Sequence, residues 1–423
     1  MKPAGSIAGP CRWLAGFLLA SLAVQASPPA VPLIRHVFIV VLENQDYEAS
    51  FGPASPAAYL KSLRQRGVSV PNYYGTSHFS LGNYLTLISG QTPNPATNED
   101  CEIFEEFISS GTTPDGQAIG KGCVYPANIQ TLANQLDRAH LTWKAYMEDM
   151  GNNPRRESAT CGHPAIGTRD PTQAAEVGDQ YATRHNPFVY FHAIIDTPGC
   201  ARNVVSLKEL AADLRSAKST PNYLFITPNL CHDGHDGGGS ARCVNGEPGG
   251  LVSADTFLRK LVPQILASAA YRRDGLLIVT FDESGMAETY DDAGNVVSMA
   301  AGAAAACCNE PSGPNIRPYQ ADPALATPGM NGPGMMGPGG GRIGAVLLSP
   351  FIRPGTVTTT DYNHYSLLRS IEDIFGLKHL GFAAQPGLKS FGADIFNRPR
   401  QGMRQAAACR APARPCAADP GDR

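Results

Sequence analysis

The sequence feature that most constrains the fold is an unbroken apolar run at residues 35–42, RHVFIVVL, which ends abruptly at Glu43 and Asn44. A run of this kind, rich in β-branched residues, is typical of a strand that is buried on both faces of a parallel sheet. In open α/β sheets, the groups just beyond the carboxyl ends of the strands form the ligand crevice. Glu43 and Asn44 are therefore candidate site residues, although a turn is the simpler explanation for one such pair taken alone.

Similar runs recur along the chain, and helical patterns lie between them. The further strand candidates are residues 223–227, 275–281 and 343–349. The helical patterns are at residues 57–66, 129–139, 207–216, 254–268 and 366–375. Strands that alternate with helices in this way predict an α/β fold with a parallel, doubly wound sheet.

Acidic residues and histidines follow the later strands as well. Asp282 and Glu283 end one run directly, Asp233 and His235 lie in the loop after another, and His364 follows the last. Because the carboxyl ends of parallel strands meet at one edge of a sheet, we expect these residues to converge there. So many oxygen ligands would repel one another unless a divalent cation lay among them. The added histidines favour zinc or another transition metal.

A reactive serine is predicted in residues 76–90, TSHFSLGNYLTLISG. Ser80 is expected to be the N-cap of a short helix that ends at Gly90. The start of a helix favours an anion such as phosphate, so a hydroxyl there is well placed to attack phosphorus. Taken alone, the stretch is more simply explained by an ordinary serine N-cap, and only the other predicted site residues favour a catalytic role.

A metal bound to Ser80 would lower the pKa of its hydroxyl group and orient it for in-line attack. This chemistry fits a covalent phosphoserine intermediate. His78, His235 and His364 are the candidates for the general acid that protonates the leaving oxygen. Ser77 is the alternative nucleophile.

The N-terminal residues predict export. Lys2 and Arg12 precede an apolar run at residues 13–24, and small residues end at Ala26, which together are typical of a secretory signal peptide. The run is too short for a confident membrane span, and no later stretch is long enough. The predicted organisation is a signal peptide at 1–26, a catalytic domain at 27–396 with a cap-like insertion at about 148–203 and an irregular loop at about 284–341, and a poorly ordered tail at 397–423.

Cysteine usage also favours an exported chain. Of the 11 cysteines, only Cys11 lies in the predicted signal peptide, which leaves an even number. An even set in an exported protein predicts disulfides. Local pairing would join Cys101 with Cys123, Cys161 with Cys200, Cys231 with Cys243, and Cys409 with Cys416, while Cys307 and Cys308 would pair with each other or elsewhere.

The net charge and the content of charged residues limit the kinds of molecule that the protein is expected to bind. The net charge of −3 and the 17% of charged residues provide no basic field for nucleic acid, and no Lys/Arg block marks a membrane-surface patch. We therefore expect a small substrate, no nucleic acid and no integral membrane span. The sequence makes no prediction of the oligomeric state.

Five segments occur in an order that is typical of a known enzyme family. They are LEN at residues 42–44, HFSLGNY at 78–84, PNLCHDGHD at 228–236, TFDE at 280–283 and NHYSLLR at 363–369. In this order they resemble the bacterial phosphoesterase family, which includes acid phosphatases and non-haemolytic phospholipases C within the alkaline phosphatase superfamily. The likeness covers about residues 35–385.

The resemblance implies an alkaline-phosphatase-like three-layer α/β sandwich with a mostly parallel central sheet and long loop insertions. It implies a hydrolase of phosphoric esters that uses Ser80 as nucleophile and one or two divalent ions. The implied metal ligands are Glu43, Asn44, Ser80, Asp282 and Glu283. Asp233, His235 and His364 would contact a second metal or the phosphate, and we further predict substrate contacts from Asn83, Asp233 and His185. The chain departs from the family pattern at Phe79 and Gly82, where prolines often flank the nucleophile, and at Glu283, which stands for a second Asp.

Besides an acid-phosphatase-like monoesterase, two other enzymes and one non-catalytic protein are alternatives. A phospholipase C would need a lipid-binding mouth, for which residues 188–191 and 143–147 are candidates, although a buried core or strand is the better interpretation of both runs. A sulfatase would need a Cys-x-Pro-x-Arg type stretch, and none stands near Ser80. From another class, an exported protein that binds metal or anions without turnover would use the same residues.

Overall fold

The computed structural model describes residues 32–285, 288–290, 296–299, 305–316 and 338–398. Its central strand is β1 (His36–Leu42), whose seven residues are all buried. β1 pairs in parallel with β11 (Gly275–Phe281) on one side and with β10 (Tyr223–Thr227) on the other. The first apolar run of the sequence therefore lies in the middle of the sheet, as its composition predicts.

The central sheet has eight strands in the order β15-β2-β14-β11-β1-β10-β7-β9. The remaining members are β2 (Val68–Val70), β7 (Trp143–Met147), β9 (Val204–Ser206), β14 (Ala345–Leu348) and β15 (Thr356–Val357). The five strands from β11 to β9 run parallel, whereas β14 is antiparallel to both β11 and β2. The prediction of an α/β fold with a mostly parallel central sheet is confirmed.

The direction of β14 corrects one expectation. Because β14 is antiparallel, its carboxyl end lies at the opposite edge of the sheet, where the Ser349 hydroxyl donates a hydrogen bond to the Gly275 carbonyl oxygen over 2.7 Å. His364 is therefore not delivered by the end of this strand. A separate short strand, β16 (Tyr362–Asn363), pairs in parallel with β3 (Tyr73–Tyr74) and leads into the helix that begins at His364.

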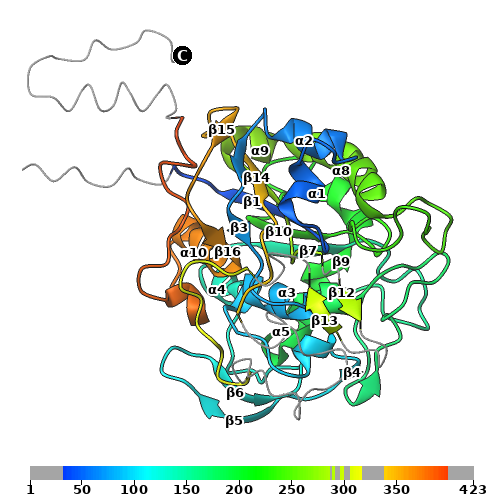
Figure 1. Cartoon of the computed structure of the whole chain (residues 1–423). Helices are drawn as coiled ribbons and strands as arrows, with labels where there is room; N and C mark the ends of the chain where they lie inside the picture. The colour runs from blue at the N-terminus through cyan, green and yellow to red at the C-terminus, as the bar shows by residue number, and fades with distance from the viewer. Residues whose placement is uncertain (1–31, 286–287, 291–295, 300–304, 317–337, 399–423) are drawn as a thin grey trace, which may run out of the picture. The chain divides into compact units, whose positions relative to one another are not determined.

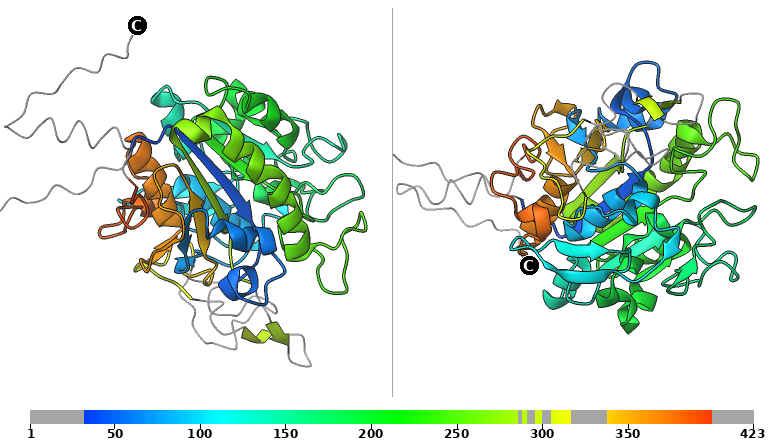
Figure 2. Two further views of the ribbon diagram at one scale, coloured as in Figure 1. Left: turned by 90° about the horizontal axis from the view of Figure 1, so that it is seen from above. Right: turned by 60° about the horizontal axis from the view of Figure 1, so that its bottom comes forward.

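Helices cover both faces of the sheet and complete three layers (Figure 1). One face carries α1 (Tyr47–Phe51), α2 (Ala58–Leu63), α8 (Gly250–Ala267) and α9 (Ala269–Asp274). The other carries α3 (Ser80–Ser89), α4 (Leu132–Arg138), α5 (His192–Ile195) and α10 (His364–Phe375). Two further short helices, α6 (Pro198–Asn203) and α7 (Leu210–Asp213), flank β9 in the sequence. The left view of Figure 2 shows α8, the long green helix, lying along the sheet beside β1.

Long loops carry small two-stranded ribbons of their own. These pair β4 (Ile103–Phe104) with β8 (Thr168–Arg169), β5 (Ile108–Thr112) with β6 (Ala118–Lys121), and β12 (Glu288–Tyr290) with β13 (Val296–Met299). Short 3-10 turns, among them η2 (Thr183–His185) and η3 (Pro187–Tyr190), occupy the segment predicted as a cap-like insertion. The boundaries of that insertion and of the catalytic domain stay predictions.

The two aromatic runs are part of the core. Residues 143–147 form strand β7, and Phe188 is fully buried with its ring stacked on Trp143 at 5.0 Å and packed edge-on against Phe225 at 5.4 Å. Neither run is placed to form an exposed lipid-binding mouth. This packing confirms the core interpretation of both.

Three predicted disulfides are present: Cys101 with Cys123, Cys161 with Cys200, and Cys231 with Cys243. Cys307 and Cys308 are bonded to each other, which was one of two alternatives. The predicted Cys409 and Cys416 pair, the signal peptide and nearly all of the C-terminal tail lie outside the described residues. Among the helices of the described part of the chain, none combines the length and the apolar character needed to cross a bilayer.

Candidate active site

Ser80 opens helix α3, and its hydroxyl is turned toward an acid. The N-cap position belongs to Phe79, so the expectation that Ser80 itself caps the helix is wrong. Ser80 Oγ instead donates a hydrogen bond to Glu43 Oε2 over 2.7 Å. Only 5% of Ser80 is exposed, so this hydroxyl lies in a nearly dry environment. An N-cap serine would have bonded the helix backbone, whereas the Ser80 hydroxyl is bonded to a carboxylate.

The backbone before Ser80 is held in an unusual conformation. Phe79 has a φ of 70°, a value that non-glycine residues rarely adopt and that costs about 1–3 kcal/mol. Asn83 holds the preceding loop, because its Oδ1 accepts hydrogen bonds from the Thr76 and Ser77 amides and its Nδ2 donates to the Ser77 carbonyl oxygen over 2.8 Å. The Asn83 amide is thus occupied within the protein, which differs from the substrate contact expected from the sequence.

Three buried carboxyl groups converge below Ser80. Glu43 follows β1, Asp282 follows β11 and Asp233 lies in the loop after β10, and these three strands are neighbours in the sheet. All three residues are fully buried. Burial raises the pKa of each of them well above its usual value, and the neighbouring carboxylates raise the pKa of each further. Such a cluster needs positive charge or protons to remain folded.

Asn44 lies after β1 and Glu283 lies after β11, and their contacts differ. The backbone N–H of Asn44 donates a hydrogen bond to Asp282 Oδ1 over 3.0 Å. The φ of Asn44 is 49°, a value that asparagine adopts more readily than most residues. Glu283 Oε2, by contrast, is hydrogen-bonded to Nδ1 of the buried His78. Glu283 therefore neutralises part of its charge through a histidine.

Four side-chain oxygens of this cluster fit a cation. Each is buried and has no hydrogen-bond partner among the described residues: Glu43 Oε1, Asn44 Oδ1, Asp233 Oδ2 and Asp282 Oδ2. Unpartnered carboxylate and amide oxygens are the donors that hard divalent cations prefer, and a nearby imidazole extends the set to transition metals. The donor chemistry therefore matches the predicted metal.

The tightest cluster of ligand atoms in the described residues lies elsewhere. Cys231, His232 and Glu247 bring theirs within 4.8 Å of one another, while no three of the predicted carboxylate and histidine ligands do so. The disulfide with Cys243 removes the Cys231 thiolate from that cluster, and His232 is held between Glu247 and Glu148. The unpartnered oxygens around Glu43 are thus the better candidate for a metal.

His185 extends the cluster on the side of α3. Its Nε2 lies 3.3 Å from Glu43 Oε1, its Nδ1 lies 3.9 Å from Asp233 Oδ2, and its ring stacks on Tyr84 at 5.2 Å. Burial lowers the pKa of His185 well below its usual value, so the imidazole is neutral and one of its nitrogens can coordinate a metal. His185 was predicted to contact substrate, but it faces the acidic cluster.

A cavity of 310 Å³ opens over Ser80. The residues that line it are Asn44, Phe79, Ser80, Asp100, Arg184, His235, Glu283 and Gly285. Of the three histidines predicted as general acids, His235 alone is in this lining, and its Nε2 lies 3.3 Å from Asn44 Nδ2. The cavity thus brings an exposed histidine and the Ser80 hydroxyl together.

The other two histidines are enclosed by the protein. His78 is occupied by Glu283, as described above. His364 Nε2 lies 2.5 Å from the Asp282 carbonyl oxygen and its Nδ1 lies 3.1 Å from the Tyr73 hydroxyl. Burial lowers the pKa of His364 to about 4. Both are placed to position the acidic strand ends, which corrects the expectation that they act directly as general acids.

Asp100 and Arg184 are cavity residues that the sequence did not reveal. Asp100 Oδ1 accepts a hydrogen bond from the Leu81 amide over 3.0 Å, so a carboxylate already lies at the start of α3. Arg184 Nε lies 3.8 Å from Asp100 Oδ2. Neither residue follows a predicted strand; their proximity to Cys101 and His185 in the sequence was the only available signal.

Comparison with known proteins agrees with the family resemblance. An acid phosphatase of Aspergillus fumigatus is 26% identical over 345 residues, which cover 81% of this chain and 55% of the relative. The phosphate-repressible acid phosphatase of Penicillium chrysogenum is 24% identical over 340 residues, 80% of this chain and 58% of the relative. This chain therefore spans less than two thirds of the length of these fungal relatives.

A bacterial relative matches over more of its own length. The phosphatidylinositol-3-phosphatase of Mycobacterium tuberculosis is 24% identical over 375 residues, 88% of each chain. Among solved structures, a protein in the alkaline phosphatase superfamily from Vibrio parahaemolyticus is 12% identical, with a TM-score of 0.45 over 86% of this chain and 72% of that one. The sequence profile of the Phosphoesterase family matches residues 54–378, more than half of the chain, and the chain therefore belongs to the Phosphoesterase family.

Proposed function

We propose that this protein is an exported, metal-dependent hydrolase of phosphate monoesters that acts through a phosphoserine at Ser80. The observation that carries the proposal is the hydrogen bond to Glu43 from Ser80, a residue that lines the 310 Å³ cavity. Membership of the Phosphoesterase family and the acid phosphatases among its relatives support the reaction class. The disulfides support export, because such bonds persist in oxidising compartments.

Glu43 and His235 carry the proton transfers of the proposed reaction. Ser80 Oγ attacks phosphorus and passes its proton to Glu43 Oε2, which already accepts it as a hydrogen bond. The bond from phosphorus to the ester oxygen breaks, and the departing alcohol takes a proton from protonated His235; burial lowers the pKa of His235, so this step requires acidic conditions. A water molecule then attacks the phosphoserine and gives a proton to His235, while Ser80 regains its proton from Glu43 and inorganic phosphate leaves.

Arg184 is the cationic side chain in the cavity lining. Its guanidinium group is suited to bind two non-bridging oxygens of the phosphate. Asp100 lies beside it and limits the directions in which that guanidinium can point. Arg184 therefore orients the phosphate for attack by Ser80.

The cation would be held by the four unpartnered oxygens of Glu43, Asn44, Asp233 and Asp282. The other two predicted metal ligands, Ser80 and Glu283, line the cavity together with Asn44. Asp233, which was predicted to contact a second metal or the phosphate, is added here to the ligands of this cation. A cation bound there neutralises phosphoryl charge and lowers the pKa of the serine hydroxyl. Glu43 serves both needs because it presents Oε2 to Ser80 and keeps Oε1 unpartnered.

A substrate panel tests the proposal. Purified protein is assayed with p-nitrophenyl phosphate, p-nitrophenylphosphorylcholine and phosphatidylcholine, each with and without a chelator. We expect chelator-sensitive release of p-nitrophenol from the first compound. Cleavage of only the two choline compounds would replace the monoesterase with a phospholipase C, and metal binding without any hydrolysis would leave a non-catalytic binding protein.

A further inference from the structure

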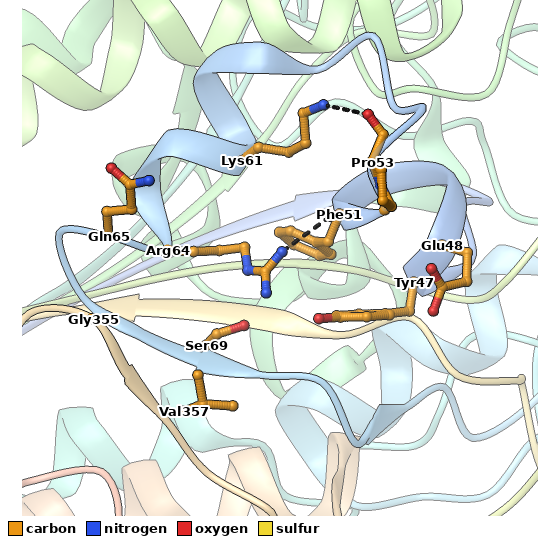
Figure 3. A pocket seen from close by; sticks show the side chains of 11 residues that line it. Tyr47, Glu48, Phe51, Pro53, Lys61, Arg64, Gln65, Ser69, Gly355 and Val357 are labelled. Atoms are coloured by element: carbon orange, nitrogen blue, oxygen red, sulfur yellow. Dashed lines mark hydrogen bonds between the residues drawn. The ribbon is translucent and has the colours of Figure 1, made fainter.

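A second and larger cavity of 660 Å³ lies away from Ser80 at the β15–β2 edge of the sheet (Figure 3). It is an open cavity bordered by α1, α2, β2 and β15, and it shares no lining residue with the cavity over Ser80. Its volume falls within the range of small-molecule sites, about 300–1,000 Å³. No part of the proposed reaction uses it.

Two cations on α2 and its C-terminal end line this cavity without an acidic partner. Lys61 Nζ donates to the carbonyl oxygens of Pro53 and Ser55, and Arg64 donates from one terminal nitrogen to the Phe51 carbonyl oxygen over 3.0 Å. Within the described residues, neither forms an ion pair. Arg64 is therefore held in place while most of its five N–H donors remain available.

A buried hydroxyl faces the same space. Ser69 is 1% exposed, lies in the middle of β2, and its Oγ has no hydrogen-bond partner among the described residues. Figure 3 shows the Ser69 and Tyr47 hydroxyls and the Arg64 guanidinium turned toward one another across the cavity. An unpartnered buried hydroxyl costs free energy unless a ligand or water completes it.

The remaining lining favours an anion with an organic group attached. Glu48, the carboxylate in the lining, forms an ion pair with Arg342 at 3.1 Å, so a positive charge lies beside its negative one. The ring of Tyr47 packs against that of Phe51 at 5.4 Å and forms an aromatic wall. The cavity is several times larger than a phosphate ion, so there is room beside the donors for a small organic moiety.

We propose that this cavity binds the phosphate group of a small molecule through Arg64, Ser69 and Tyr47. Donors that converge from three separate elements match an oxyanion with three or more oxygens better than a planar carboxylate. Free phosphate and a phosphate carried on an organic group share this chemistry. The ligand class follows from these contacts and does not depend on the reaction at Ser80.

Binding stoichiometry tests the proposal. Inorganic phosphate and, separately, phenylphosphonate, which has no ester bond to hydrolyse, are titrated calorimetrically into the full-length protein and into Arg64→Ala and Ser69→Ala. Arg66→Ala is the matched control, because it removes the same charge from an exposed position outside the lining. We expect a class of site in the wild type and the control whose Kd rises at least tenfold in Arg64→Ala and in Ser69→Ala.

Preference between the two probes identifies the ligand. Tighter phenylphosphonate binding at the Arg64-dependent site assigns an organic phosphate, and tighter inorganic phosphate binding assigns the free ion. Circular dichroism checks the fold of each variant, and Tyr47→Phe replaces any variant that does not fold. Equal titrations of the wild type and the folded variants, or no binding of either probe, would overturn the proposal. If the site at Ser80 fails to bind phosphate, that loss appears in every protein and leaves the Arg64-dependent difference intact.

Discussion

The Ser80 hydroxyl is hydrogen-bonded to Glu43 Oε2 at 2.7 Å, which joins the first residue of α3 to the first residue after β1. These two residues are far apart in the sequence and meet only because β1 is central and α3 begins at its carboxyl end. The second carboxylate oxygen of Glu43 has no hydrogen-bond partner in the described part of the chain. One buried acid can therefore orient the serine and hold a cation.

Replacing Ser80 with alanine is expected to lower kcat by several orders of magnitude, because the nucleophile and its activating groups act as a unit. Hydrolysis of p-nitrophenyl phosphate measures the effect. Ser77→Ala is the matched control, since Ser77 lies in the loop just before α3 and is also buried. A fully active Ser80→Ala protein together with an inactive Ser77→Ala protein would transfer the nucleophile role to Ser77.

Removal of the cation is expected to abolish turnover reversibly. Dialysis against a chelator should reduce the metal content, measured by mass spectrometry, and the activity in parallel, and an added divalent ion should restore both. Asp282→Asn should lower the metal content at least tenfold, because Asp282 Oδ2 is one of the unpartnered buried oxygens. Asp361→Asn at an exposed position is the control. An Asp282→Asn protein with full metal content would argue against this ligand set.

Arg184→Ala is expected to weaken phosphate binding. Hydrogen bonds to charged groups contribute about 1.5–3 kcal/mol, which corresponds to roughly a 10- to 100-fold increase in KM. Steady-state kinetics with p-nitrophenyl phosphate measure the change, and Arg184→Lys should recover part of it. Arg169, whose side chain is 69% exposed in a pair with Glu102, provides the control substitution to alanine. An unchanged KM in Arg184→Ala would remove this residue from the site.

Glu372 is expected to make the fold less stable as the pH rises. It is fully buried in α10, its Oε2 has no hydrogen-bond partner among the described residues, and burial raises its pKa from 4.5 to about 9. The folded state therefore holds a proton that the unfolded state releases above pH 4.5, so this stabilisation is complete at acidic pH and is lost as the pH rises toward 9.

Glu372→Gln removes this dependence, because glutamine stays neutral and its oxygen still accepts from the Leu380 amide, which is 2.9 Å from Glu372 Oε1. We expect Glu372→Gln to exceed the wild type in stability by roughly 4–5 kcal/mol at pH 8 and to match it near pH 4.5, because each pH unit between the two pKa values is worth about 1.4 kcal/mol. Thermal unfolding across this pH range measures the difference. Parallel Tm curves for the two proteins would show that Glu372 does not titrate as described.

Much of the fold could be predicted because burial on both faces forces long apolar runs. The apolar runs at β1, β10 and β11 predicted parallel strands. The polar residues that follow these runs predicted that Glu43, Asp233 and Asp282 lie at one edge of the sheet. The run at β14 was equally apolar, and nothing in its composition reveals that it is antiparallel. Apolar content reports burial, whereas direction depends on the connections and neighbours of the strand.

The roles of single side chains were harder to predict. His78, His235 and His364 look alike in the sequence, yet two of them are enclosed by acidic strand ends and His235 alone among them lines the cavity over Ser80. Asn83 lies close to the proposed nucleophile in the sequence, but its side-chain amide forms hydrogen bonds with the backbone of the preceding loop. Which way a loop side chain points depends on contacts with distant residues, and no local pattern carries that information.

By itself, the sequence determined the α/β class, the family and the acidic strand ends, because each of these depends on a local run of residues or on the order of short motifs. Only the tertiary structure decided that Ser80 points at Glu43, that Asp100 and Arg184 line the cavity, and that four buried oxygens lack hydrogen-bond partners among the described residues. These facts depend on side chains that are brought together from remote parts of the chain. Their distances are set by the packing of whole elements, which a one-dimensional pattern does not encode.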